Sequence, residues 1–304
     1  MILVALAVIL AATAGIVCER RFAGAPRAAA LILRGMLYVL LPFVSYVNIA
    51  HLHMTAGTGV GIALAWVTMA VVCGLAYKIG RGALELRDAE LGAVICSVAV
   101  VNTGYLGLPM AVALLGTHAL GAAVAYDQLV SGPALFIVGF GVGATFGTHA
   151  EAGGMARART FFTRNPPLLA VAAGLLAGPA LAPAPLPAIS HLVVDGLLVL
   201  GFFTVGIYLA SERREDGASL LERPDRRVAL AVVLRMMVAP LVLGLLSLVV
   251  IRVPTAYLLQ STMPSGINSL IVGHVYGLDQ RLIATIIVLS TIIGLVGGLL
   301  VTTL

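Results

Sequence analysis

Two polar stretches interrupt otherwise apolar segments of this 304-residue chain: VNTGYLGLP at residues 101–109 and STMPSGINS at residues 261–269. Each combines proline, glycine, asparagine and hydroxyl residues near the middle of a run long enough to cross a membrane. A proline within a helix frees a carbonyl group one turn earlier, and glycine adds backbone freedom. Because lipid offers no hydrogen bonds, such a break persists only where it lines a cavity or packs against protein. The two stretches therefore predict two broken membrane helices.

The sequence around the breaks is that of a membrane protein. It is 61% hydrophobic and 10% charged, whereas soluble domains carry about 25% charged residues. About 20 apolar residues suffice for a helix to cross the hydrocarbon, and such runs follow one another along the whole chain. We expect an all-α polytopic membrane protein with ten transmembrane helices, at residues 1–17, 28–50, 57–78, 90–116, 119–147, 165–182, 189–210, 227–251, 254–276 and 281–303.

Positive charge alternates between the connecting loops. Fifteen of the 18 Lys and Arg residues lie in the loops that follow odd-numbered spans, and the other loops are almost bare. Because cytoplasmic loops carry the excess of Lys and Arg, we place the odd loops in the cytoplasm and both termini outside it. The net charge of +5 then reflects topology in a lipid bilayer and indicates no nucleic-acid partner.

Five spans in each half would set the second half upside down relative to the first. We therefore expect two inverted five-helix repeats, at residues 1–150 and 151–304, and both breaks fall in the fourth span of their own half. A pair of Gly/Pro-interrupted spans at corresponding positions is a pointer to the binding site of a secondary transporter. The alternative is a pair of ordinary proline kinks.

The residues of the two breaks also predict the charge of the ligand. The first amides of a half-helix lack partners, and its N-terminus carries a partial positive charge that attracts carboxylates. Neither break contains Lys or Arg, so we expect a small organic anion held by neutral donors; a cation held by freed carbonyls is the alternative. The candidate substrate-binding residues are Asn102, Thr103, Gly104, Pro109, Gln128, Pro264, Ser265 and Asn268.

Four charged residues fall within the predicted spans: Arg34, Asp127, Asp195 and Arg235. Such residues are costly in a membrane and suggest function. Asp127, in the span after the first break, is the candidate for coupling transport to protons; the alternatives are a structural pair with Arg235 or a helix cap. The three cysteines and six histidines show no metal-ligand spacing, and no nucleophile is paired with a base. The sequence thus predicts no metal, no cofactor and no enzymatic activity.

The residues at both breaks resemble those of the auxin efflux carrier family. Residues 102–109 followed by Gly116 are similar to its fourth span. Residues 263–268 followed by YGLD at 276–279 are similar to its ninth. NPP at 165–167 and LLP at 40–42 fit as well, so the resemblance runs the whole length of the chain. The family includes plant auxin exporters and bacterial members proposed to move malate or malonate.

The resemblance implies an elevator-type transporter with a fold like that of sodium/proton antiporters. Spans 4 and 9 would cross at their prolines, here Pro109 and Pro264. Spans 3–5 and 8–10 would form a moving transport domain, and spans 1, 2, 6 and 7 a scaffold that is often a homodimer interface. Asn102 matches the family's asparagine implicated in carboxylate binding, and Asp127 or Gln128 falls where the family often has a polar residue.

Two departures narrow the expected function. The plant proteins carry a long cytoplasmic loop between spans 5 and 6 and charged residues within span 3, whereas here the loop is short and residues 57–77 hold no acid. A short-looped chain resembles the bacterial members, which reside in the inner membrane. We expect an exporter of a malate/malonate-like dicarboxylate or an auxin-like monocarboxylate. The alternative is a cation-coupled importer resembling bile-acid/sodium symporters, or a sodium/proton antiporter.

Overall fold

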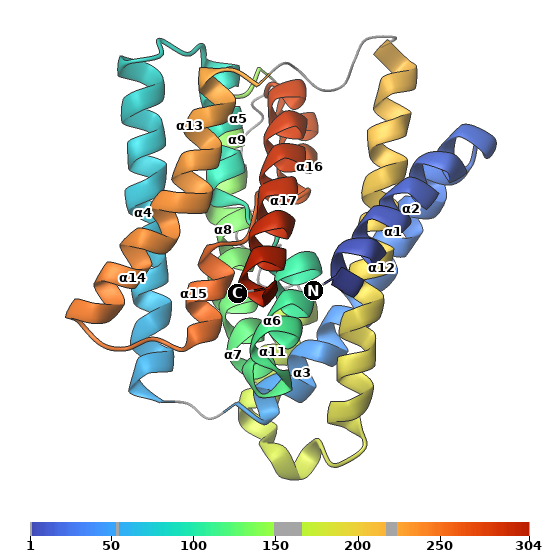
Figure 1. Ribbon diagram of the computed structural model, residues 1–304, viewed down its shortest axis with the longest axis vertical. Coiled ribbons are helices and arrows are strands. Elements are labelled where there is room, and N and C mark those ends of the chain that lie inside the picture. The colour runs from blue at the N-terminus through green and yellow to red at the C-terminus, as the bar shows by residue number, and fades with distance from the viewer. Residues whose placement is uncertain (1, 53–54, 149–165, 217–223, 304) are drawn as a thin grey trace.

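The computed structural model describes residues 2–52, 55–148, 166–216 and 224–303, and this part of the chain is a bundle of helices (Figure 1). In the first half the successive predicted spans hold α1 (Ile2–Arg21); α2 (Ala25–Gly35), η1 (Met36–Leu40) and α3 (Leu41–Ala50); and α4 (Ala56–Gly82). The fourth holds α5 (Asp88–Ala99), η2 (Thr103–Gly107) and α6 (Leu108–Leu115). The fifth holds η3 (Thr117–Ala119), α7 (Leu120–Tyr126), η4 (Asp127–Ser131), α8 (Gly132–Ala134), η5 (Leu135–Gly139) and α9 (Phe140–Phe146).

The second half also consists of helices in its described residues. Its first two predicted spans hold α11 (Pro166–Ala177) with η6 (Pro179–Leu181), and α12 (Leu186–Asp216). The other three hold α13 (Arg226–Val233), η7 (Leu234–Val238) and α14 (Ala239–Val249); α15 (Thr255–Ser261) and α16 (Asn268–Tyr276); and α17 (Gln280–Thr303). The predicted joint between the halves, near residues 149–164, lies outside the described residues.

The predicted class, an all-helical polytopic membrane protein, is confirmed. Five helices of the described part are long and apolar enough to cross a membrane, at 56–82, 117–146, 186–204, 226–249 and 280–301. Two shorter apolar helices lie at 38–50 and 103–115. The count of ten spans and the inverted repeat stay predictions.

Prolines within the spans explain four of the π-helical segments in the described residues. The π-helical segments η1, η2, η4 and η7 each end two residues before a proline, namely Pro42, Pro109, Pro133 and Pro240. A proline ring clashes with the carbonyl four residues earlier and has no N–H to donate. A π turn bonds five residues apart and so relieves both problems without ending the helix. Each helix therefore continues through its proline.

The helices pack into two groups. α1 lies along α12 at the right of Figure 1, and α11 lies along α3 near the lower middle of the picture. The backbones of α1 and α12 touch, since a Cβ added at Gly206 would lie 2.0 Å from the carbonyl oxygen of Ala12. The other group shares a core of buried side chains contributed by α4, α5, α13, α16 and α17. A second core joins the two groups, through α3 and α12 on one side and α6 and α7 on the other.

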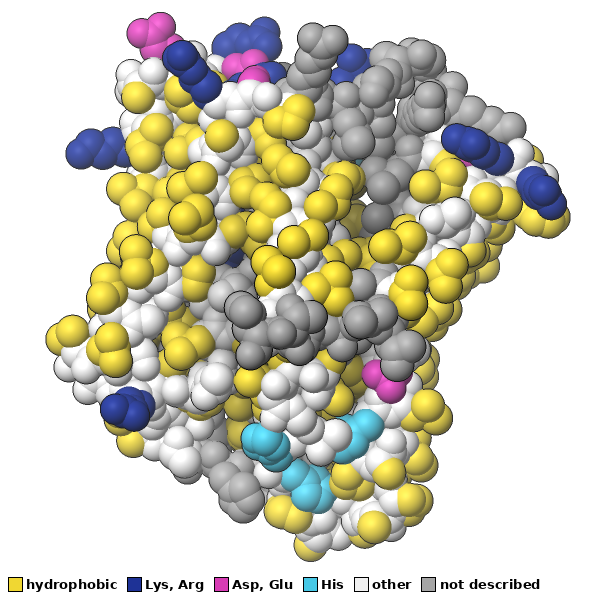
Figure 2. Space-filling model, viewed as in Figure 1, with side chains coloured by type: hydrophobic (Ala, Val, Ile, Leu, Met, Phe, Trp, Pro, Cys, Tyr) yellow, Lys and Arg dark blue, Asp and Glu magenta, His cyan; other side chains and the backbone are white. Residues whose placement is uncertain are grey.

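Charge is distributed along the long axis of the bundle. Figure 2 shows most Lys and Arg side chains at the upper end, a wide band of hydrophobic side chains below them, and the histidines near the lower end. The upper end is where α4 ends and α13 begins. This separation is the one expected if the upper end faces the cytoplasm.

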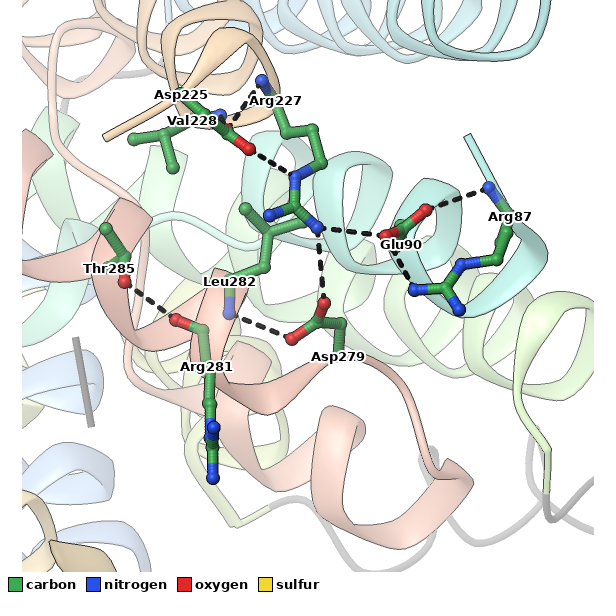
Figure 3. Close-up of polar contacts among 9 residues, drawn as sticks. All are labelled: Arg87, Glu90, Asp225, Arg227, Val228, Asp279, Arg281, Leu282 and Thr285. Atoms are coloured by element: carbon green, nitrogen blue, oxygen red, sulfur yellow. Dashed lines mark hydrogen bonds and ion pairs between the residues drawn. The ribbon is translucent and has the colours of Figure 1, made fainter. Parts of the chain in front are cut away.

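An ion-pair cluster at the upper end ties three segments of the second group together (Figure 3). Arg227 of α13 lies 2.9 Å from Glu90 of α5 and 3.6 Å from Asp279, which precedes α17. Its Nε also donates to Asp225, the N-cap of α13, at 2.6 Å. Partial burial raises the pKa of the Asp225 carboxyl, but hydrogen bonds from Arg227 and Val228 lower it further, so the net pKa lies below its ordinary value. The Asp225 carboxylate therefore stays ionised beside the Arg227 guanidinium near neutral pH.

We predict that Arg227→Gln lowers the free energy of unfolding by about 1–2 kcal/mol, the scale of charge-assisted hydrogen bonds that are partly screened. Arg226→Gln is the matched control, because Arg226 is the exposed neighbour and loses the same charge. The measurement is the melting temperature of the purified protein at low and high salt. Equal melting temperatures for the two variants would contradict a structural role for the cluster.

Candidate functional site

The two predicted breaks meet in the middle of the bundle. One lies between α5 and η2, and the other between α15 and α16. Val101 and Ser265 face each other there as an isolated antiparallel bridge. The N–H of Asn102 donates to the carbonyl oxygen of Pro264 at 2.9 Å. Backbone groups that each break frees are thus partly satisfied by the other break, and we call this pairing the crossover.

A second backbone bond completes the crossover and demands a glycine. The N–H of Gly266 donates to the carbonyl oxygen of Val100 at 2.8 Å. A Cβ added at Gly266 would lie 2.9 Å from the carbonyl carbon of Val101, closer than real Cβ atoms come to backbone. The breaks therefore cross at van der Waals distance, with no side chain between them.

The position of the crossing corrects one expectation. The resemblance implied that the spans cross at Pro109 and Pro264, but Pro109 lies in the first turn of α6, beyond the crossing. α6 continues directly from η2, and the π turn before Pro109 accommodates the missing N–H of the proline. Only Pro264 lies in the crossover itself, and Val101 takes the place expected for Pro109.

Asp127 lies against the start of η2. Its buried carboxylate accepts hydrogen bonds from the Thr103 hydroxyl and, at 2.6 Å, from the Gln128 amide. A Cβ added at Gly104 would lie 3.4 Å from the same carboxylate, so the backbone of this first turn borders it. The structure thus brings together four of the predicted residues at one half-helix N-terminus, where negative charge is stabilised. The alternative pairing of Asp127 with Arg235 is absent from the described residues.

The two asparagines flank the crossover. Asn102 is buried, and its side-chain oxygen accepts from the N–H of Leu106 at 3.2 Å, which caps η2. Within the described residues, its amide nitrogen Nδ2 donates to no group. Asn268 opens α16 and is partly exposed. A ligand at the crossover would therefore meet at least one unengaged amide donor.

Ser265 has a structural role. It is fully buried, and its hydroxyl donates to the carbonyl oxygen of Ser97 at 2.7 Å. Its N–H donates to the hydroxyl of Ser290 in α17 at 3.2 Å. Both contacts anchor the second break to neighbouring helices, so the hydroxyl and the N–H of Ser265 are already engaged.

Two further buried residues complete the crossover, and the sequence alone did not place either of them there. Gln260 of α15 donates to the carbonyl oxygens of Thr103 and Ala123, at 3.3 and 3.2 Å. Its own oxygen packs against Gly107 and has no hydrogen-bond partner among the described residues. The sequence signal that could have identified Gln260 is its position directly before the polar stretch at residues 261–269.

Arg235 is the other. It lies in η7, is 2% exposed, and donates to the carbonyl oxygens of Val98, Ser261 and Met263. The sequence marked Arg235 as an intramembrane charge, but hydropathy carries no information about which backbone groups a side chain reaches.

No group of three or more His, Cys, Asp or Glu among the described residues is arranged to hold a metal ion.

Two broken helices that cross inside an apolar helical bundle are typical of secondary transporters. Comparison with known proteins agrees with that class. Residues 164–301 match the family model described as membrane transport protein. The match confirms the resemblance to auxin efflux carriers and malonate-transporter-like proteins at the level of the family.

A curated relative supports the same class over more of the chain. A protein of Methanocaldococcus jannaschii named as an uncharacterized transporter is 28% identical over 223 residues, which make up 71% of this chain and 69% of the relative. Both matches are to membrane transporters, and the chain is a membrane transporter.

We predict that Gly266→Ala lowers the free energy of unfolding by about 1–3 kcal/mol, because the added methyl group forces the two backbones apart. Gly244→Ala on α14 is the control, since a Cβ there meets nothing within 4 Å. The melting temperatures of the two purified variants check this. Equal melting temperatures for the Gly266→Ala and Gly244→Ala proteins would contradict the close approach of the two backbones at the crossover.

Proposed function

We propose that this chain is a secondary transporter that exports a small organic anion, a malate/malonate-like dicarboxylate or an auxin-like monocarboxylate, bound at the crossover. The observation that carries the proposal is that two half-helix N-termini lie at the crossover, next to the unengaged amide of Asn102. Neither break contains Lys or Arg. Neutral donors and helix ends of this kind favour carboxylates.

Asp127 gives the site a means of coupling to protons. Its carboxylate borders the same helix end that would attract the substrate. Two carboxylates at one helix end repel each other in a medium of low dielectric constant. Substrate binding is therefore favoured when Asp127 carries a proton, and the protonation of Asp127 then follows the occupancy of the site.

The packing of the helices supports an elevator mechanism. α4, α5, α13, α16 and α17 share one core, and the ion-pair cluster joins α5, α13 and the start of α17, as expected of a transport domain that moves as a unit. α1, α3, α11 and α12 pack on one another, as expected of a scaffold. The proposal includes inverted repeats at residues 1–150 and 151–304, a homodimer through the scaffold, and a bacterial inner membrane with both termini outside the cytoplasm.

We predict that Asn102→Asp abolishes transport, reducing the rate at least about tenfold, while the protein stays folded. Aspartate keeps the oxygen that caps η2 but replaces the amide donor with a negative oxygen, and a lost charge-assisted hydrogen bond is worth about 1.5–3 kcal/mol. The measurement is malate or malonate flux in proteoliposomes, after a thermal-shift screen of carboxylates has chosen the substrate.

Two further variants sharpen this test. Asn102→Ala removes both the cap and the donor, so it should lose transport and also some stability. Asn48→Ala, which removes a buried asparagine of α3 bonded to Ser190, should keep transport. Normal flux in the Asn102→Asp protein would remove the amide from the site.

We predict that Asp127→Asn flattens the pH dependence of transport, because asparagine is neutral at every pH and keeps the size of the side chain. The initial rate is measured in proteoliposomes from pH 5 to pH 8, with the wild type in parallel. A variant whose pH profile matches that of the wild type would rule out Asp127 as the coupling residue.

A further inference from the structure

One guanidinium group joins the C-terminal ends of both broken helices. Nη1 of Arg235 donates to the carbonyl oxygen of Val98, in the last turn of α5, at 3.4 Å. Nη2 donates to the carbonyl oxygen of Ser261, the last residue of α15. Nε donates at 3.1 Å to the carbonyl oxygen of Met263, just beyond that end. These are carbonyls that lose their helical partners where the spans break.

The charges of this arrangement balance without a carboxylate. Each helix C-terminus carries about half a negative charge, so the two ends together offset about one positive charge. Among the described residues no acid forms an ion pair with Arg235, and Asp127 is held by Thr103 and Gln128 instead. A buried charge is costly unless it is paired and hydrogen-bonded. Here the partner of Arg235 is the crossover backbone itself.

Carbonyl oxygens at half-helix C-termini are also the ligands with which broken-helix transporters coordinate sodium. In this chain the guanidinium already occupies three such oxygens, and the planar fork of arginine suits several acceptors at once. Lysine or arginine is present in neither break, so this fixed charge comes from a different span.

We propose that Arg235 is the resident cation of the crossover: it holds the carbonyl oxygens that a bound sodium ion would hold, so neither the fold nor transport requires a small monovalent cation. Arg235 is a positioning residue, since it touches the backbone of the site and not the substrate. The transport part rests on the proposed function, whereas the cation-binding part does not.

The test replaces the tethered cation with a free one. Melting temperatures are measured in sodium, lithium, potassium and choline chloride at equal ionic strength, for the wild type, Arg235→Gln and the control Arg235→Lys, which keeps the charge. The wild type should have the same melting temperature in all four salts, and so should Arg235→Lys. Arg235→Gln should melt lower in choline and regain about 3 °C or more in sodium or lithium, because a ligand that binds only the folded state stabilises it.

Two results would overturn the proposal. The first is an Arg235→Gln protein that melts equally in all four salts, because arginine would then matter only for packing. The second is a wild type that melts higher in sodium than in choline, and this measurement holds even if Arg235→Gln does not fold. Because melting requires no substrate, the salt series stands even if no organic anion is transported. Where flux is found, replacing sodium by choline should leave the wild-type rate unchanged.

Discussion

Every backbone N–H and C=O group at membrane depth needs a partner inside the protein, and this requirement organises the structure. A continuous helix meets it automatically, but a broken helix does not. The chain breaks two spans and brings the breaks together, so that Asn102 bonds Pro264 and Gly266 bonds Val100. Side chains from other spans meet several of the carbonyl oxygens that remain, namely those of Val98, Thr103, Ser261 and Met263. The crossover is thus a joint that several helices must complete, and the core around α5 holds them in register.

The crossover has two electrical ends, and the chain treats them differently. Its negative end, made of helix C-termini, is matched by a guanidinium, which stays charged at every physiological pH. Its positive end, at the start of η2, borders the carboxylate of Asp127, which can gain or lose a proton. One end is therefore constant and the other adjustable. In the proposed function, this asymmetry confines the exchange of charge to the side where the substrate would bind.

Much of this arrangement could be predicted from the sequence, because it is written in local patterns. Hydropathy and loop charge indicated the spans, and the Pro/Gly/Asn clusters indicated the breaks. The grouping of Thr103, Gly104 and Asp127 follows from their places in neighbouring spans. The crossing at Val101 and the carbonyl partners of Arg235 could not be predicted, because both depend on where backbone groups distant in the chain meet. Backbone atoms are identical at every residue, so no side-chain pattern records where they meet.

The π turns before the membrane prolines affect how this chain is compared with its relatives. A π turn holds one residue more than the α turn it replaces, so the residues beyond it are rotated by about 100° relative to an uninterrupted helix. A relative that lacks Pro133 or Pro240 would be expected to be one residue shorter inside that helix. Gaps in an alignment then belong within the spans as well as in the loops. At 28% identity, a one-residue error there would assign the neighbours of Asp127 or Arg235 to the wrong face.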